Sequence, residues 1–224
     1  LLFMLRNPTD RVISYFRSSF GQPHVATYGL DSDQFVDEAL RGARADPAQE
    51  STLTDRQRAF RQELRICKYD DFLPSFLEYF PPERTHIAFF DQLQDSPFKL
   101  IKNICTFAGL DTGYLDDYTF RVENRTRPHR STRLRSLAAQ MNTALEPILN
   151  RFPALRRGAR HVYDLVNVDD DQEIAFSTDA RERLDDYFRP WNVAIHDLMV
   201  DTFPEAPLPK WLQPQAVKSD GGQR

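Results

Sequence analysis

Several features that would define a function class are scarce in this sequence. The 224-residue chain has 2 cysteines and 8 glycines, and its apolar runs are short. A membrane-spanning helix needs roughly 18 apolar residues, so the sequence predicts no such helix. Basic residues do not dominate either, because 29 Lys and Arg stand against 33 Asp and Glu, a net charge of −4. That balance argues against a general nucleic-acid-binding protein.

Metal-binding patterns are missing as well. Cys67 and Cys105 lie in apolar helical patterns without ligand spacing, so we interpret both as small buried apolar residues. No two histidines have metal-ligand spacing, and the acidic run 169–171 lacks the further ligands of a calcium loop. The sequence therefore predicts no metal site. His24 and His129 lie in predicted loops and could approach a substrate, although a structural or surface role is the simpler interpretation.

The chain opens with a pattern typical of an α/β protein. Residues 1–5 form a continuous apolar run, as expected for a short strand buried in a parallel sheet. Asn7 can cap a helix, and Pro8 suits its first turn. An apolar face then continues at helical spacing, so we expect a helix over 8–20.

A second strand and helix follow later in the chain. Residues 85–90 are predicted to form a strand, and Ser96-Pro97 to begin a helix that ends at Gly109. This order favours a layered α/β domain. Other predicted helices lie around 35–40 and at 54–67, 71–80, 132–150 and 178–199, the last interrupted by Pro190.

The most informative residues lie at the end of the first strand. Arg6 occupies its carboxyl end, the edge at which open α/β sheets bind ligands. The next helix should direct backbone N–H groups toward the same place, which favours an anion. Ser14 lies two helical turns after Asn7, so Arg6 and Ser14 can converge on one phosphate. The alternative is a surface salt bridge for Arg6 and a merely tolerated Ser14.

The segment 2–16, LFMLRNPTDRVISYF, resembles the 3'-phosphate-binding motif of sulfotransferases that use 3'-phosphoadenosine-5'-phosphosulfate (PAPS). That motif is a strand, then Arg-Asp/Asn-Pro, then Arg and Ser on a helix. The resemblance implies that Arg6 and Ser14 bind the 3'-phosphate of the cofactor, and that Arg11 has a structural role.

A second segment is similar to the same family. The strand 86–90, the turn 90–93, Ser96-Pro97 and the helix ending Phe-Ala-Gly-Leu at 107–110 match its late strand and helix. Trp211 resembles a tryptophan common near the family's C-terminus. The similarity covers about 1–112 well and the rest of the chain loosely.

The resemblance implies a three-layer α/β domain of the P-loop type with a parallel sheet. The family's Lys-rich 5'-phosphosulfate loop has no counterpart here, so we expect this chain to lack the N-terminal strand-loop-helix. The catalytic base is likewise expected upstream of Leu1, and we name no catalytic residue. We therefore expect a partial domain over 1–216, inactive alone and with an exposed apolar surface, and a disordered tail over 217–224.

A run of arginines between 121 and 135 is the next candidate site, with Glu123 as its one acid. In the family, a late loop closes over the nucleotide with basic and backbone donors. The resemblance therefore implies that Arg127 and Arg130 bind the cofactor, or else an anionic acceptor such as a sulfated sugar. A solvated basic loop is the alternative.

The resemblance implies sulfuryl transfer from PAPS to a hydroxyl or amine acceptor, a small molecule or a glycan, without a metal. The alternative is a non-catalytic fragment or pseudoenzyme that binds adenosine 3',5'-bisphosphate or an anionic glycan.

Overall fold

The computed structural model describes residues 1–19, 29–120 and 174–213. Two compact units divide these residues. The first unit contains 1–11, 66–120 and 184–213, and the second contains the described parts of 12–65 and 122–183. Each unit therefore assembles segments that are far apart in the sequence.

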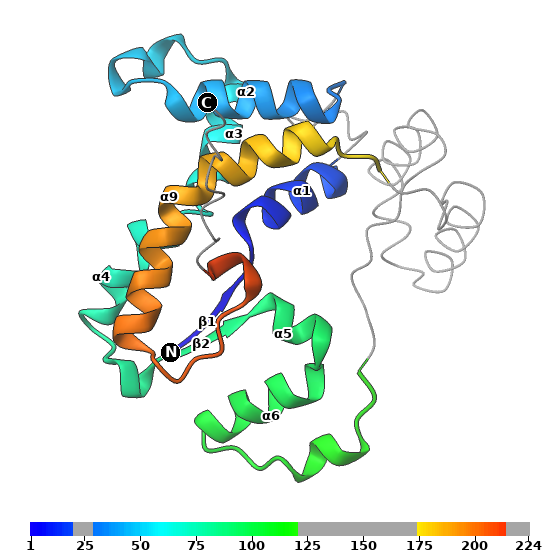
Figure 1. Ribbon diagram of the computed structural model, residues 1–224, viewed down its shortest axis with the longest axis vertical. Coiled ribbons are helices and arrows are strands. Elements are labelled where there is room, and N and C mark those ends of the chain that lie inside the picture. Colours follow the sequence, from blue (N-terminus) through cyan, green and yellow to red (C-terminus); the bar gives the residue numbers. More distant parts are fainter. Residues whose placement is uncertain (20–28, 121–173, 214–224) are drawn as a thin grey trace, which may run out of the picture. The chain divides into compact units, whose positions relative to one another are not determined.

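The first unit contains a two-stranded parallel sheet (Figure 1). β1 (Leu2–Leu5) pairs with β2 (His86–Phe89), in a register that places Leu5 opposite Phe89. Parallel strands need a long crossover, and here 80 residues separate Leu5 from His86 on the chain. The predicted strands at 1–5 and 85–90 are confirmed, as is their parallel pairing in one sheet.

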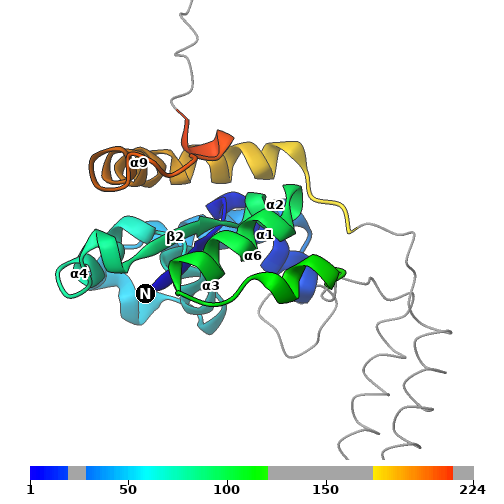
Figure 2. The same ribbon diagram turned by 90° about the horizontal axis from the view of Figure 1, so that it is seen from below.

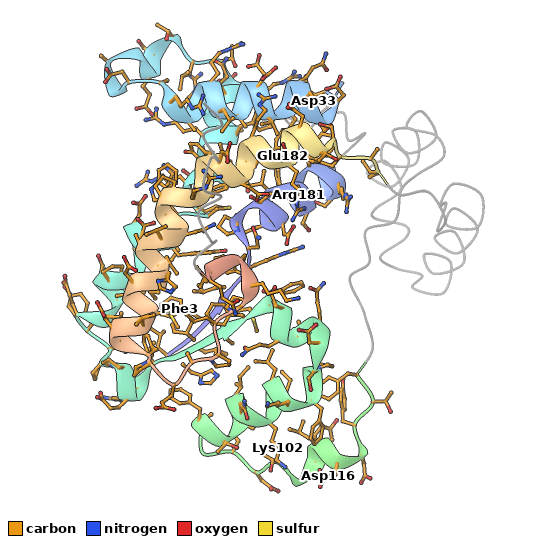
Figure 3. All side chains as sticks on the ribbon, in the orientation of Figure 1. Phe3, Asp33, Lys102, Asp116, Arg181 and Glu182 are labelled. Carbon is orange, nitrogen blue, oxygen red and sulfur yellow. The ribbon has the colours of Figure 1, made fainter. Side chains whose placement is uncertain are left out.

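One face of this sheet is buried in the core of the first unit. Leu5, Ile87 and Phe89 pack in one cluster with Ile195 and Met199 of α9 (Thr178–Thr202). Figure 2 shows the C-terminal part of α9 running along this side of β2. Three short helices add residues to the same cluster: η2 (Tyr69–Asp71), α4 (Leu73–Leu77) and η5 (Lys210–Leu212). Phe3, labelled in Figure 3, meets the ring of Phe76 on α4 edge-on.

The opposite face of β1 is partly exposed among the described residues. Leu2 and Met4 alternate with the more buried strand residues and are 45% and 41% exposed. That this surface is the one expected from the sequence stays a prediction.

The segment after β2 is helical. α5 (Phe90–Asp95) follows the strand directly, and α6 (Pro97–Phe107) comes next. Pro97 occupies the first turn of α6 as predicted, but the Ser96 side chain makes no capping hydrogen bond. Gly109, with φ of 68°, follows the helix in the left-handed conformation that glycine adopts without strain. The short helices η3 (Pro82–Arg84) and η4 (Gly113–Asp117) flank this region of the chain.

The second unit is built around helices with interlocking aromatic rings. α1 (Pro8–Ser19) continues into this unit, which also contains α2 (Ser32–Arg44), η1 (Pro47–Thr52) and α3 (Asp55–Arg65). Phe16, Phe35 and Phe60 are fully buried, with ring centroids 5.1 and 4.9 Å apart along the series. Each ring comes from a different helix, so these contacts hold the three helices together.

Three predictions of helices need correction. α9 runs through Pro190 without interruption, because Leu184 and Phe188 before it and Ile195 after it are buried. That burial outweighs the cost of proline, about 3 kcal/mol in a helix interior. The helix predicted at 71–80 is shorter and divided between η2 and α4, with Pro74 in the first turn of α4. The stretch predicted around 35–40 is the middle of the longer α2.

Two further predictions, the helix at 132–150 and the tail at 217–224, lie outside the described residues. Within the described residues, no helix is both long enough and apolar enough to span a membrane.

Candidate functional site at the carboxyl end of the sheet

Arg6 follows the last residue of β1, at the carboxyl edge of the sheet. Its guanidinium carbon lies 4.5 Å from the centre of the Phe90 ring, which follows β2 in the same way. Among the described residues, the Arg6 guanidinium has no hydrogen-bond or ion-pair partner. The Phe90 ring therefore supports the Arg6 cation without occupying the guanidinium N–H groups. Those N–H groups are available to an anion.

The start of α1 is capped by its own sequence. Asn7 Oδ1 accepts hydrogen bonds from the backbone N–H of Thr9 at 2.9 Å and of Asp10 at 3.4 Å. Pro8 has no N–H to offer. The sequence predicted that this helix start would present unpaired N–H groups to an anion. The asparagine cap instead occupies two of them, which leaves the Arg6 guanidinium as a donor without a hydrogen-bond partner among the described residues.

A tyrosine from elsewhere in the chain fixes the backbone of Arg6. The Tyr69 hydroxyl donates to the Arg6 carbonyl at 2.9 Å and accepts from the Arg6 N–H at 3.3 Å. Tyr69 is 7% exposed, and burial raises the pKa of its phenol to about 12. Sequence reasoning did not identify this contact, because 63 residues separate the two positions and no local motif marks Tyr69.

The start of α5 is held by a residue from the C-terminal part of the chain. The Trp211 indole N–H donates to Asp91 Oδ2 at 3.2 Å, and the Trp211 ring lies edge-on to Phe89 at 6.2 Å. Gln92 Oε1 accepts from the Phe89 N–H at 3.0 Å, which closes the first turn of the helix locally. Trp211 was singled out by resemblance alone, and these contacts give it a role in supporting the helix start that carries Phe90.

Ser14 lies on α1, in the second unit, and is half-buried. Ser18 and Ser19 of the same helix both donate their hydroxyls to the Tyr15 carbonyl. Within the described part of the chain, the Ser14 hydroxyl makes no such bond. Its hydroxyl is therefore not committed to the helix backbone, unlike the hydroxyls of the other two serines.

Arg11 and the two cysteines take part in hydrogen bonds and packing away from the Arg6 guanidinium. Arg11 Nη1 lies 3.1 Å from Cys67 Sγ, and Cys67 is buried as predicted. Cys105 was also predicted to be buried, but it is only half-buried; Leu100 is the buried residue of its helix, α6. Within 1–19, 29–120 and 174–213, no cluster of three or more metal-ligating side chains is present.

The other candidate residues named from the sequence, Arg127, Arg130, His24 and His129, lie outside the described residues. At the carboxyl edge of the sheet, the structure thus brings together Arg6, Phe90, Tyr69, Asp91 and Trp211 from four separate segments of the chain. The arrangement supplies a supported guanidinium with open donors, which suits binding of a phosphate or sulfate group.

Comparison with known proteins places this geometry in context. A family model described as "Sulfotransferase domain" matches residues 1–159, which include both strands, α1 and the turn after β2. Among curated proteins, the comparison found no match.

Proposed function

Because the chain belongs to the sulfotransferase domain family, we propose that it is the part of a sulfotransferase that binds the cofactor's 3'-phosphate, in an enzyme that transfers a sulfuryl group from PAPS to a hydroxyl or amine acceptor. The observation that carries the proposal is the Arg6 guanidinium. It stands at the carboxyl edge of the sheet, stacked on Phe90 and without an ionic partner in the described residues. A cation placed in this way matches a phosphate dianion.

In the proposed reaction, the acceptor oxygen or nitrogen forms a bond to sulfur while the bond from sulfur to the 5'-phosphate oxygen breaks. Adenosine 3',5'-bisphosphate leaves, and the acceptor loses its proton to a general base that we do not assign to any residue of this chain. Neither the phosphates nor the sulfuryl group requires a metal in this scheme, since cationic and N–H donors can stabilise the charge.

We assign the 3'-phosphate to Arg6 and Ser14. Arg6 contributes a planar fork of donors, and Ser14 contributes a neutral hydroxyl that its own helix does not use. Ser14 follows Asn7 by seven residues, which on an α-helix corresponds to two turns along the same face. We further propose that Arg127 and Arg130 bind the nucleotide or an anionic acceptor such as a glycan.

Arg6→Ala tests the assignment directly. Hydrogen bonds to a charged group contribute roughly 1.5–3 kcal/mol each. We therefore expect the variant to bind adenosine 3',5'-bisphosphate about tenfold to a hundredfold more weakly. Binding of adenosine 5'-phosphate, which lacks the 3' group, should change far less. Isothermal titration calorimetry of both nucleotides with both proteins gives the comparison.

Arg189→Ala is the matched control. Arg189 is an exposed arginine of the same unit, ion-paired with Asp186, and exposed pairs contribute little. Its removal should leave both affinities unchanged. Equal losses for the two nucleotides in Arg6→Ala would mean that Arg6 supports the fold rather than binding the 3'-phosphate.

A further inference from the structure

We propose that Tyr69 is a positioning residue for the phosphate site, because its hydroxyl holds the Arg6 backbone at the point where the chain leaves the sheet. The inference rests on the proposed role of Arg6. It adds a residue that lies 63 positions away in the sequence and acts through the Arg6 backbone.

The two hydrogen bonds are made to one residue. Tyr69 Oη donates to the Arg6 carbonyl at 2.9 Å and accepts from the Arg6 N–H at 3.3 Å. The strand pairing ends one residue earlier, at Leu5 opposite Phe89. The Tyr69 hydroxyl thus takes the place of a neighbouring strand for Arg6, and it restrains the peptide groups on both sides of the Arg6 Cα.

Tyr69 itself is held firmly. Its ring belongs to the buried cluster that contains Leu5, Leu73 and Phe89, and it meets the Phe72 ring edge-on at 6.0 Å. The burial that raises the pKa of Tyr69 to about 12 also keeps the hydroxyl protonated at any pH at which the protein is handled. The hydroxyl can therefore donate and accept at the same time.

Fixing the backbone matters because, among the residues that the structure describes, the Arg6 side chain is held by its contact with the Phe90 ring alone. The Phe90 ring supports the guanidinium at 4.5 Å, a contact that restricts its height above the ring but leaves rotation within the plane. Bidentate binding of a phosphate requires the direction of the fork as well. Tyr69 fixes the backbone from which the Arg6 side chain extends, and Phe90 contacts the guanidinium at its end.

Tyr69→Phe removes only the hydroxyl and keeps the packed ring. We expect the affinity for adenosine 3',5'-bisphosphate to fall about threefold to tenfold, while that for adenosine 5'-phosphate changes less than about twofold. Tyr79→Phe is the control, because Tyr79 is 80% exposed in the same unit and its hydroxyl should not affect either nucleotide. Calorimetric titration of both nucleotides with the unmodified 224-residue chain and with each variant gives the comparison.

A double-mutant cycle separates positioning from general stabilisation. If Tyr69 acts through Arg6, then Tyr69→Phe should have no further effect on nucleotide binding in an Arg6→Ala background. Losses that add in the double variant, or equal losses for the two nucleotides, would overturn the inference and leave Tyr69 with a structural role. Unchanged affinities in Tyr69→Phe would overturn it as well.

The same titrations distinguish a failure of the proposed function. If the unmodified chain shows no preference for the 3'-phosphorylated nucleotide, and Arg6→Ala changes nothing, the phosphate role of Arg6 is wrong, and with it the role of Tyr69. If that preference depends on Arg6 but not on Tyr69, only the positioning role is wrong.

Discussion

Gly42 on α2 lies close to the backbone of α3, and this close contact leaves no room for a side chain. A Cβ atom at this position would lie 2.6 Å from the Gln57 carbonyl oxygen of α3. Gly42→Ala should therefore force the two helices apart and destabilise the protein by about 1–3 kcal/mol, as overpacking of a tight contact does. Urea unfolding measures the change.

Gly113→Ala provides the comparison at the residue scale. The nearest atom to a Cβ there is an Asp111 side-chain oxygen at 3.5 Å, an ordinary contact distance. We expect a change within about 0.5 kcal/mol. A loss of similar size at both positions would show that the helix contact at Gly42 is not the cause.

Individual site residues differ in how far the sequence could reveal them. Arg6 was identified because it follows an apolar run and precedes a helix-start pattern, both of which are local signals. The contacts of Tyr69 and Trp211 could not be predicted, since they depend on which distant segments meet in the fold. The cap by Asn7 was predicted, but not its consequence that two N–H groups are no longer available to an anion.

At the scale of elements, the N-terminus of α9 is held by a small hydrogen-bond network within the second unit. Ser177 Oγ accepts from the Ala180 N–H at 3.0 Å and donates to Asp33 of α2 at 2.7 Å (Figure 3 labels Asp33). The Ser177 N–H in turn donates to Ser32 Oγ at 3.1 Å. One serine thus caps α9 and ties it to the start of α2.

Ser177→Ala should remove both roles of that hydroxyl. Loss of a serine cap costs about 0.5–2 kcal/mol, and we expect the upper part of that range because Asp33 Oδ1 also loses the hydrogen bond from Ser177, while Ser32 still donates to Asp33 Oδ2. Thr106→Ala is a suitable control, since the exposed Thr106 hydroxyl only bonds back to the Lys102 carbonyl of its own helix. Chemical denaturation of both variants should show a loss for Ser177→Ala alone, and equal losses would contradict the capping role.

Element types were largely readable from the sequence, and element lengths less so. The two strands, α1, α3 and α6 follow from apolar periodicity and from Asn and Pro at helix starts. α9 continues through Pro190 because tertiary burial overrides the local cost, which no local pattern reveals. α5 was also missed, because the stretch after β2 was predicted as a turn.

At the scale of the whole molecule, composition along the chain does not delimit the two units. The sequence contains no linker-like stretch, and each unit draws on segments from distant parts of the chain. What the sequence patterns did predict is an α/β protein with a parallel sheet. The structure shows such a sheet, with two strands in the described residues. The family was recognised from motifs that lie within the matched residues 1–159.

The stability of the molecule should depend on pH through His86. This strand residue packs against the Phe107 ring at 5.1 Å, and its partial burial lowers the pKa of the imidazole below its usual value. The unfolded chain therefore binds a proton more readily than the folded one as pH falls through about 6.5. We expect the free energy of unfolding to decrease over that range.

His86→Gln should make this decrease smaller, because the variant has no group to protonate at that position. Asp70 acts with the opposite sign, since burial raises the pKa of its carboxyl and protonation then favours the folded state. The substitution leaves Asp70 in place, so the difference between the two proteins reports the histidine alone. Urea unfolding between about pH 5 and pH 8 measures both curves. Parallel curves would contradict the prediction and would mean that the strand tolerates a charged imidazole as well as a neutral one.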